Sequence, residues 1–355
     1  MKTRIKARII LILSLLMFSC DYETHVVNTV HTDGSVSRTV TMQNSESKFE
    51  PSAFKVPVDS TWNMVISPVT NEKQDTVSWL LTAKKEFAGV DEINREYAAD
   101  SGSNHFLKRS ASFTRYFRWF YTSYRYSEKI GNILLTECPV EDFLTEEQLR
   151  FYYYPEEVRH TLLNGSDSLT YRKLESETDS CSERWIWSVF YREWTMLLFD
   201  STGVQAGPGL DREAVKRKEN EVIAMIIADT SASDDSEEAV FRYIVGDEAF
   251  EKYRPAIDSS VKLLEKRMEL LWAARSYGME IRMPGTIYAS NGYAGTPTDS
   301  LGSGGIFWTV EGSYFLNEPF EMWVESRINN YWAWGATAFF VLFVLAGFIL
   351  RKRPD

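Results

Sequence analysis

Histidine and cysteine, the side chains most often used to bind transition metals or attack substrates, are scarce in this chain of 355 residues. It has four histidines and three cysteines. The nearest approach to a metal motif is one Glu157-x-x-His160, whereas a di-iron bundle needs two such motifs and two further glutamates. Gly-x-Ser-x-Gly, Walker-type and His-Glu-x-x-His motifs are absent from the sequence. We therefore predict no catalytic residues, no metal, no cofactor and no enzymatic activity.

Positive charge is also in short supply. The chain has 39 Lys and Arg against 50 Asp and Glu, a net charge of -11. Seven of the basic residues and one acid lie at the two ends, so the part between them has 32 basic and 49 acidic residues, a net charge near -17. Such a surface repels phosphate backbones, which excludes nucleic acid as a partner. We also expect this part of the chain to stand off anionic lipid headgroups.

The first residues have the pattern of a secretory leader. Four basic residues within the first eight precede an apolar run of roughly 11 residues, well short of the ~20 that span a bilayer. The following Met17-Phe18-Ser19-Cys20 resembles a bacterial lipobox, although lipoboxes prefer leucine where Met17 stands. We predict that residues 1–19 are a lipoprotein signal peptide and that Cys20 is the lipid attachment site, carrying palmitate or a related acyl chain. An ordinary signal peptide with a cysteine nearby is the alternative.

The last residues have the pattern of a membrane span. Residues 332–350 carry no charge, and 19 helical residues measure about 28 Å, close to the ~30 Å hydrocarbon core. Aromatic residues begin the segment and Arg351-Lys352-Arg353 ends it, so the positive-inside rule places the C-terminus in the cytoplasm. We predict one transmembrane helix over 331–350, a cytoplasmic tail over 351–355 and, between the two anchors, a periplasmic domain on the bacterial inner membrane.

Two cysteines remain if Cys20 is acylated. Cys138 and Cys181 would lie in an oxidising periplasm, which permits a disulfide between them. Two thiols do not define a disulfide framework, because the sequence says nothing of the distance between their Cα atoms. Two buried free thiols are the alternative that we favour.

The periplasmic part divides into three stretches with different periodicity. Residues 20–138 read as β-rich, residues 139–277 as helical and residues 278–330 again as β. Asp33-Gly34 supplies a turn between two alternating strands. The strands are expected at 26–30, 36–42, 62–69, 76–82, 279–283, 286–290, 306–310 and 320–327, and a helix at 86–99. Residues 106–126 are expected to form either one long strand or a hairpin. We predict an α+β fold in which strands 36–42 and 320–327 share one antiparallel sheet, with the helical part inserted between its N- and C-terminal strands.

One expected strand is unusually aromatic, and two interpretations of it stay open. It carries Phe117, Trp119, Phe120, Tyr121 and Tyr124, so period-two alternation places rings on both faces. A strand packed between two core layers explains this pattern. The sharper interpretation makes the five residues one wall of a cavity that holds an apolar ligand.

The two ends of the chain resemble the LppM-type (DUF3153-like) lipoproteins of actinobacteria and their relatives. The resemblance covers about a third of the chain, and the middle is similar to insertions in lipoproteins of the Bacteroidota. Its motifs, besides the leader and the terminal span, are Asp33-Gly34-Ser35, Met283-Pro284-Gly285, Ser290-Asn291-Gly292 and Phe307-Trp308-Thr309-Val310. The resemblance implies a membrane-tethered domain able to hold a lipid or another ligand, and it implies no catalytic residues.

These observations predict a membrane-anchored periplasmic lipoprotein that acts as a binding or scaffold module in the cell envelope. Its partners would be the membrane itself and either other envelope proteins or an apolar ligand. The alternative is an envelope hydrolase or transferase acting on lipid or glycan, with Glu128, Asp142 or Glu325 as its acid.

Overall fold

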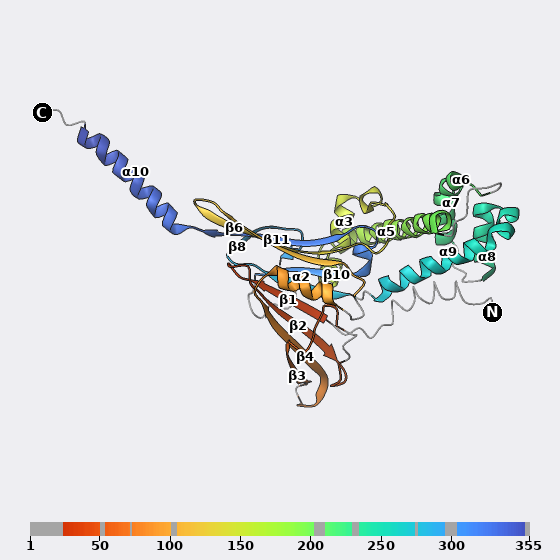
Figure 1. Cartoon of the computed structure of the whole chain (residues 1–355), viewed down its shortest axis with the longest axis horizontal. Coiled ribbons are helices and arrows are strands. Elements are labelled where there is room, and N and C mark those ends of the chain that lie inside the picture. Colours follow the sequence, from red (N-terminus) through yellow and green to blue (C-terminus); the bar gives the residue numbers. More distant parts are fainter. Residues whose placement is uncertain are drawn as a thin grey trace.

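The protein combines two β-sheets with a helical part at one end and a long single helix at the other (Figure 1). Its α+β class and C-terminal apolar helix are as predicted. The computed structural model describes residues 24–49, 54–71, 73–100, 105–201, 210–228, 234–273, 276–294 and 304–351. The leader and Cys20 lie outside these ranges.

The larger sheet, sheet A, joins strands from both ends of the chain. Its order is β3-β4-β2-β1-β7-β10-β9, antiparallel throughout except for the parallel pair β1 and β7. These strands are β1 (Thr24–Val30), β2 (Val36–Asn44), β3 (Asn63–Thr70), β4 (Thr76–Phe87), β7 (Tyr277–Arg282), β9 (Tyr293–Ala294) and β10 (Ile306–Val310).

The smaller sheet, sheet B, also mixes the two ends. Its antiparallel order is β5-β6-β11-β8, with β5 (Arg109–Phe117), β6 (Tyr121–Ile130), β8 (Thr286–Ser290) and β11 (Phe320–Asn329). N- and C-terminal strands therefore pair as expected, but in two sheets rather than one. The expectation that strands 36–42 and 320–327 share a sheet is wrong, because β2 belongs to sheet A and β11 to sheet B. Helix α2 (Val90–Ala99) begins later than predicted, since β4 continues to Phe87.

The β1–β2 hairpin forms because glycine stands in its turn where the backbone needs a positive φ. Gly34 has φ +93°, a conformation that costs glycine little and other residues much. A Cβ on Gly34 would lie 2.9 Å from the ring of Phe113 on β5, so this turn also packs against sheet B. Along both strands, buried and half-buried side chains alternate. The main apolar core lies between the sheets, where Val26 and Val40 of sheet A belong to the same buried cluster as Met322 and Val324 of sheet B.

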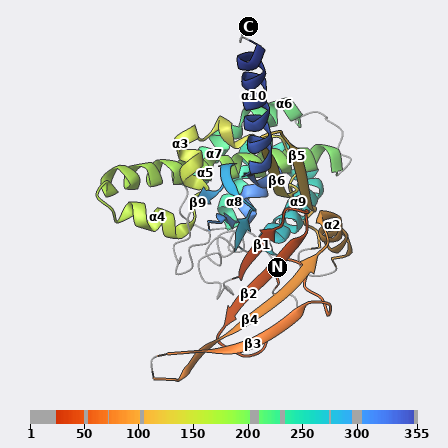
Figure 2. The same ribbon diagram turned by 90° about the vertical axis from the view of Figure 1, so that its left-hand side faces the viewer.

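The helical part leaves the sheets on the side opposite the C-terminal helix (Figures 1 and 2). Tyr191, Trp194 and Leu198 are buried in one cluster of this part, whereas Trp187 is only half-buried. The helices are α3 (Glu146–Tyr152), α4 (Glu156–Leu163), α5 (Ser168–Met196), α6 (Arg212–Arg217), α7 (Glu219–Ala228), α8 (Asp234–Val245) and α9 (Asp247–Ala273). Buried Glu193 of α5 accepts hydrogen bonds from the backbone of residues 135 and 136 and pairs with Arg267 of α9, which fixes the helices to the β part.

Gly285, in the turn between β7 and β8, is the glycine whose replacement should disturb the fold most directly. It has φ +82°, and a Cβ there would lie 2.4 Å from the carbonyl oxygen of Arg327. We expect Gly285→Ala to lower the free energy of unfolding by about 2–4 kcal/mol, because backbone strain adds to a clash with a backbone atom. Gly246 has a similar φ of +84° but nothing within 4 Å, so Gly246→Ala should lose only about 1–2 kcal/mol. Denaturant unfolding that gives equal losses for the two variants would show that crowding contributes nothing.

Candidate functional site

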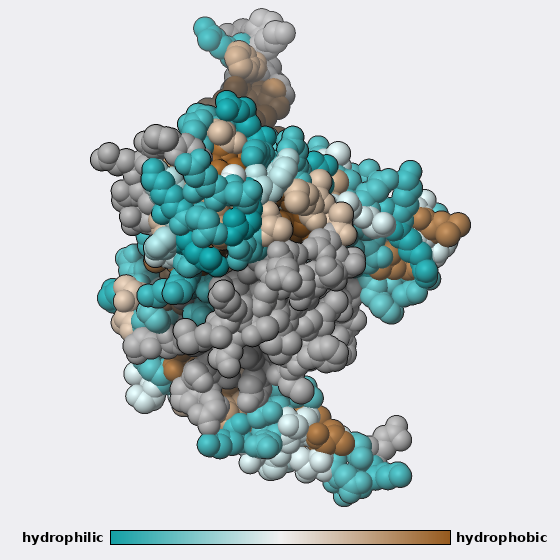
Figure 3. All heavy atoms as spheres, turned by 90° about the vertical axis from the view of Figure 1, so that its right-hand side faces the viewer, coloured by the Kyte–Doolittle hydropathy of each residue, from teal (hydrophilic) through white to brown (hydrophobic). Residues whose placement is uncertain are grey.

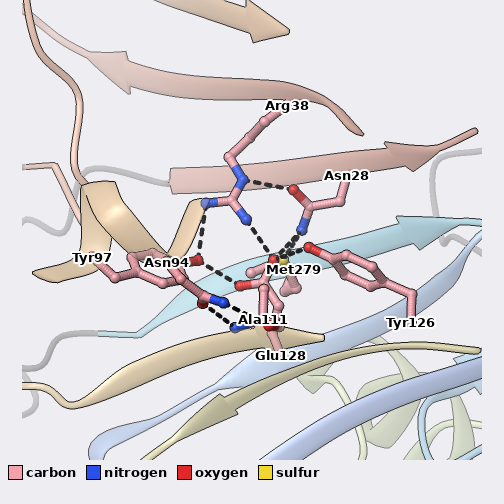
Figure 4. Close-up of polar contacts among 8 residues, drawn as sticks. All are labelled: Asn28, Arg38, Asn94, Tyr97, Ala111, Tyr126, Glu128 and Met279. Carbon is pink, nitrogen blue, oxygen red and sulfur yellow. Dashed lines mark hydrogen bonds and ion pairs between the residues drawn. The ribbon is translucent and has the colours of Figure 1, made fainter. Parts of the chain in front are cut away.

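A network of buried polar side chains lies between the two sheets (Figure 4). Sheet A, sheet B and α2 each contribute, and the exposed fraction is 7% or less for every member. Its hydrogen-bonding members are Asn28, Arg38, Tyr97, Tyr126 and Glu128. The amide of Asn28 also contacts the sulfur of Met279, at 3.1 Å.

Arg38 uses all three of its guanidinium nitrogens in this network. Its Nε donates to Oδ1 of Asn28 at 2.7 Å, and its Nη1 donates to the hydroxyl of Tyr97 at 2.9 Å. Its Nη2 pairs with Oε1 of Glu128 at 2.5 Å. The fork geometry of arginine suits such a three-way contact, whereas lysine has only a point charge to offer.

Glu128 is the acceptor on which the network converges. Besides Arg38, its Oε1 receives hydrogen bonds from Nδ2 of Asn28 at 2.9 Å and from the hydroxyl of Tyr126 at 2.6 Å. The hydroxyl of Tyr97 donates to its Oε2 at 2.6 Å. A buried carboxylate is tolerated when it is paired and its lone pairs are occupied, which is the case here.

Burial and charge determine the protonation of the groups around Glu128. Burial alone would lower the pKa of Arg38, but the adjacent carboxylate of Glu128 raises it above its usual value. Burial raises the pKa of Tyr97 and of Tyr126, and the negative charge of Glu128 adds to the effect. Both phenols therefore stay neutral and act as donors at neutral pH. Because Glu128 is only 4% exposed and already surrounded by protein donors, it holds the sheets together rather than meeting a substrate.

The β5–β6 hairpin meets the C-terminal helix α10 (Tyr331–Arg351) at the other end of sheet B. Asn330, the single residue between β11 and α10, holds the tip of the hairpin. Its Nδ2 donates to the carbonyl oxygen of Arg118 at 2.7 Å, and its backbone N–H donates to that of Phe120 at 2.9 Å. Trp119 Nε1 in turn donates to Oγ1 of Thr337 on α10, at 2.9 Å. The hairpin, β11 and the start of α10 thus form one connected unit.

Aromatic rings surround the start of α10, and we call them the aromatic collar. The hairpin contributes Phe117, Trp119 and Phe120, and the helix contributes Trp332 and Trp334. Ring centroids lie 4.5 Å apart for Phe120 with Trp334 and 5.2 Å apart for Trp119 with Trp332, distances typical of stabilising aromatic pairs. Tryptophan is enriched where a membrane-spanning helix enters the headgroup layer.

An open pocket of about 260 Å³ lies beside the collar on sheet B, and we call it the tyrosine–arginine pocket. It is lined mainly by tyrosine and arginine. The lining residues are Tyr116, Arg118, Tyr121, Ser123, Tyr124, Arg125, Tyr288, Glu325 and Arg327. They come from β5, the hairpin tip, β6, β8 and β11. The chain thus folds three arginines and one carboxylate into a single concave surface.

The charges in this pocket are only partly compensated. Glu325 pairs with Arg125 at 2.8 Å and accepts a hydrogen bond from Tyr288, whose hydroxyl is the main cause of the lowered pKa of Glu325. The guanidinium of Arg327 lies 3.7 Å from the ring centre of Tyr288 and 4.7 Å from that of Tyr121, in cation–π range. Within the described chain, neither Arg327 nor Arg118 makes an ion pair with a carboxylate. Arg327 nevertheless lies near enough to Glu325 for its charge to help lower the pKa of that carboxyl, so one carboxylate faces three arginines and the pocket keeps an excess of positive charge.

Of the two alternatives for residues 106–126, one long strand or a hairpin, the structure has the hairpin, and the expectation that the aromatic segment is covered on both faces is wrong. The chain turns back at residues 118–120, because these residues are the hairpin tip that Asn330 holds. Phe117 and Trp119 are 56% and 50% exposed, and they lie at the tip with Phe120. Of the five predicted cavity-wall residues, only Tyr121 and Tyr124 line the pocket, whose character is polar. Sequence reasoning missed Arg118 and Arg327. Arginines interleaved with aromatic residues at 115–125 were a visible signal for Arg118, but no local signal marks Arg327.

The two cysteines of the domain are free thiols. Cys138 is buried and Cys181 half-buried, and both belong to one apolar cluster with Trp185 and Val189. The disulfide that the sequence allowed is thus not formed in this structure. Burial raises the pKa of Cys138 to about 11, so its thiol stays protonated at neutral pH.

Comparison with known proteins does not assign this arrangement to a family. No family model matches the chain, and no curated protein or solved structure matches it either. Among the described residues, no group of three or more His, Cys, Asp or Glu side chains is placed to hold a metal ion.

Proposed function

We propose that the protein is a membrane-anchored lipoprotein of the cell envelope whose periplasmic domain acts as a binding or scaffold module. The observation that carries the proposal is the surface of α10. Residues Tyr331–Phe348 have a mean hydropathy of 1.7, yet only 6% of this segment is buried. A core helix of that composition would be mostly buried, and 18 helical residues measure about 27 Å, close to the ~30 Å hydrocarbon core of a bilayer.

The junction between α10 and sheet B supports a role that needs fixed orientation. Only Asn330 separates β11 from α10, and its side chain is bonded to the hairpin tip. Thr337, which binds Trp119, lies six residues into the helix, about 9 Å along its axis. With α10 in a bilayer, the collar would lie at the level where interfacial aromatic residues gather. The domain would then keep one orientation relative to the membrane, whereas a flexible linker would let it rotate freely.

The β3–β4 hairpin supports an interaction with another envelope protein. It extends from the body of the domain (Figure 2), and β3 has only β4 as a neighbour among the described strands. Met64, Val65, Ile66 and Val77 on this hairpin are 46–57% exposed. Apolar side chains along an open sheet edge are typical of surfaces that pair with a partner. By contrast, the described surface on the side away from α10 is mostly hydrophilic (Figure 3).

An acyl chain on Cys20 would constrain how the domain lies. The C-terminal end of β7 lies on the side of sheet A nearer α10, because it leads to Gly285, which packs against Arg327. Since β1 runs parallel to β7, its first residue, Thr24, lies at the end of the strand farther from α10. That strand is about 20 Å long, whereas the four residue steps from Cys20 to Thr24 reach at most about 14 Å. If both anchors enter one bilayer, we expect β1 to lie close to the membrane plane.

Two truncated or substituted forms test the anchoring. We expect Cys20→Ala to stay in the membrane fraction, because α10 remains, and to lose incorporation of labelled palmitate. A Cys20→Ala chain that ends at Asn330 should become soluble. Carbonate extraction and acyl labelling measure both outcomes, and a reporter fused after Asp355 should be active only in the cytoplasm. A reporter exposed to the periplasm, or a soluble full-length chain, would reject the proposal.

The alternative of an envelope hydrolase or transferase lacks a supporting arrangement in the described chain. Glu128 is enclosed by its network, and Glu325 is paired with Arg125. Asp142 lies on an exposed turn. We therefore do not propose it.

A further inference from the structure

We propose that the tyrosine–arginine pocket binds the phosphate of an anionic phospholipid headgroup in the membrane that α10 spans. The inference rests on the proposed membrane anchoring and adds a ligand and a site to it. Its occupant is a lipid of the surrounding bilayer, and its effect is to fix the orientation of sheet B against the headgroup layer.

The position of the pocket selects a membrane ligand. Arg118 adjoins Trp119, whose indole is bonded to Thr337 on α10, so Arg118 would lie at headgroup depth when α10 spans the bilayer. Arg327 is four residues before Tyr331 on the strand that leads into the helix. Two cations from distant parts of the chain are thus brought to one side of the pocket by the hairpin and by β11.

The local charge opposes that of the domain as a whole. The part between the two anchors carries a net charge near -17, which by itself would keep it off anionic headgroups. The pocket lining instead has three arginines and one glutamate. Screening limits distant repulsion to about 8–10 Å in salt, so the local positive surface decides what happens at contact. The proposed site would therefore be an exception to the expectation that the domain stands off anionic lipid.

The side-chain chemistry suits a phosphate. Guanidinium groups bind phosphate oxygens through two parallel N–H donors, which gives geometric selectivity as well as attraction. Arg327 lies against the rings of Tyr121 and Tyr288, which limits its rotamer freedom before a ligand arrives. Glu325 pairs with Arg125 and receives the Tyr288 hydroxyl, so it positions these two groups. It offsets the charge of Arg327 only at longer range, without an ion pair, so the N–H donors of Arg118 and Arg327 can turn to the ligand.

The test uses the full chain in detergent and a matched pair of double variants. Binding of monomeric short-chain phosphatidylglycerol is titrated and compared with that of short-chain phosphatidylcholine and of inorganic phosphate. We expect Arg118→Gln/Arg327→Gln to weaken phosphatidylglycerol binding about tenfold or more, because two charge-assisted contacts are removed. The control Arg184→Gln/Arg217→Gln makes the same change of charge at exposed positions of the helical part and should bind as the wild type does. All four arginines are exposed, so thermal unfolding should be unchanged; Arg118→Gln alone repeats the test if the double variant unfolds early.

The outcomes distinguish a lipid headgroup from free phosphate as the ligand, and they test lipid binding separately from the proposed membrane anchoring. Selective phosphatidylglycerol binding that is lost only in the pocket variant supports the inference. Equal loss in pocket and control variants, or equal binding of phosphatidylcholine, would overturn it. Inorganic phosphate that displaces the lipid at equal concentration would show a free-phosphate site and overturn it too. Because the lipids are monomeric, this result does not depend on where α10 lies, whereas carbonate extraction tests the anchoring independently.

Discussion

Replacing Glu128 by glutamine is expected to lower the free energy of unfolding by about 3–5 kcal/mol, the usual loss when one partner of a buried ion pair is removed. Glutamine would leave the guanidinium of Arg38 buried without a counter-charge. Its NH₂ group would also replace one of the two carboxylate oxygens and would face either the hydroxyl of Tyr97, which now donates to Oε2, or that of Tyr126, which now donates to Oε1. Guanidinium chloride unfolding of the full chain in detergent measures the change.

Glu177→Gln provides the matched control for this prediction. Glu177 pairs with Lys173 at 3.7 Å on the exposed face of α5, where such pairs contribute about 0.5 kcal/mol or less. The double variant Arg38→Met/Glu128→Gln should lose less than the sum of its two single variants, because neither charge is left alone. Additive losses would mean that Arg38 and Glu128 do not act as a pair, and a loss below 1 kcal/mol for Glu128→Gln would mean that the network is not a main support of the fold.

The sequence pattern could have predicted that Arg38 points into the core, but not that it pairs with Glu128. Arg38 lies between Val36 and Val40 on the buried face of an alternating strand, a position where an isolated charge is too costly to leave unpaired. The sequence thus indicates that a buried partner exists. Which of the 50 acids it is depends on how two sheets stack, and Glu128 is 90 residues away.

Local patterns predicted the individual strands and the first hairpin well, because each depends on neighbouring residues. Asp33-Gly34 turned where expected, and Gly34 has the positive φ that the turn requires. The second hairpin could be predicted only as an alternative to one long strand, because Arg118-Trp119-Phe120 contains no glycine, proline or asparagine. Its turn is held by Asn330, which is 212 residues from Arg118, so no local signal marks it.

Sheet membership was the least predictable part of the fold, for the same reason. Both sheets combine strands from the two ends of the chain, and period-two alternation does not say which distant strand is the neighbour. The candidate pocket depends on that choice, since β8 and β11 bring Tyr288 and Arg327 to Tyr121 of β6. The aromatic residues and the arginines among them could be recognised from the sequence as a site, but Arg327 could not, because it comes from a distant strand.

Raising the pH above 10 should destabilise the domain steeply. Burial raises the pKa of Tyr97 and of Tyr126 above the value of ~10 expected in the unfolded chain. The stability that comes from the two neutral phenols is therefore complete below pH 10 and is lost as the pH rises from 10 toward the folded-state pKa, because the unfolded chain releases its protons first. Each phenol should cost about 1.4 kcal/mol per pH unit, so two lose roughly 5 kcal/mol between pH 10 and 12.

The contribution of one phenol can be isolated by comparing slopes. Guanidinium chloride unfolding at pH 8, 10, 11 and 11.5 gives the free energy of unfolding for each chain. Tyr126→Phe should be less stable than the wild type at pH 8, since Glu128 loses a donor, but its stability should fall less steeply above pH 10, by about 1.4 kcal/mol per unit. Tyr116→Phe, at a position that is 56% exposed, should keep the wild-type slope. If the free energy of unfolding fell equally steeply with pH for Tyr126→Phe and the wild type, Tyr126 would ionise as readily in the folded protein as in the unfolded chain. The network between the sheets would then be open to solvent.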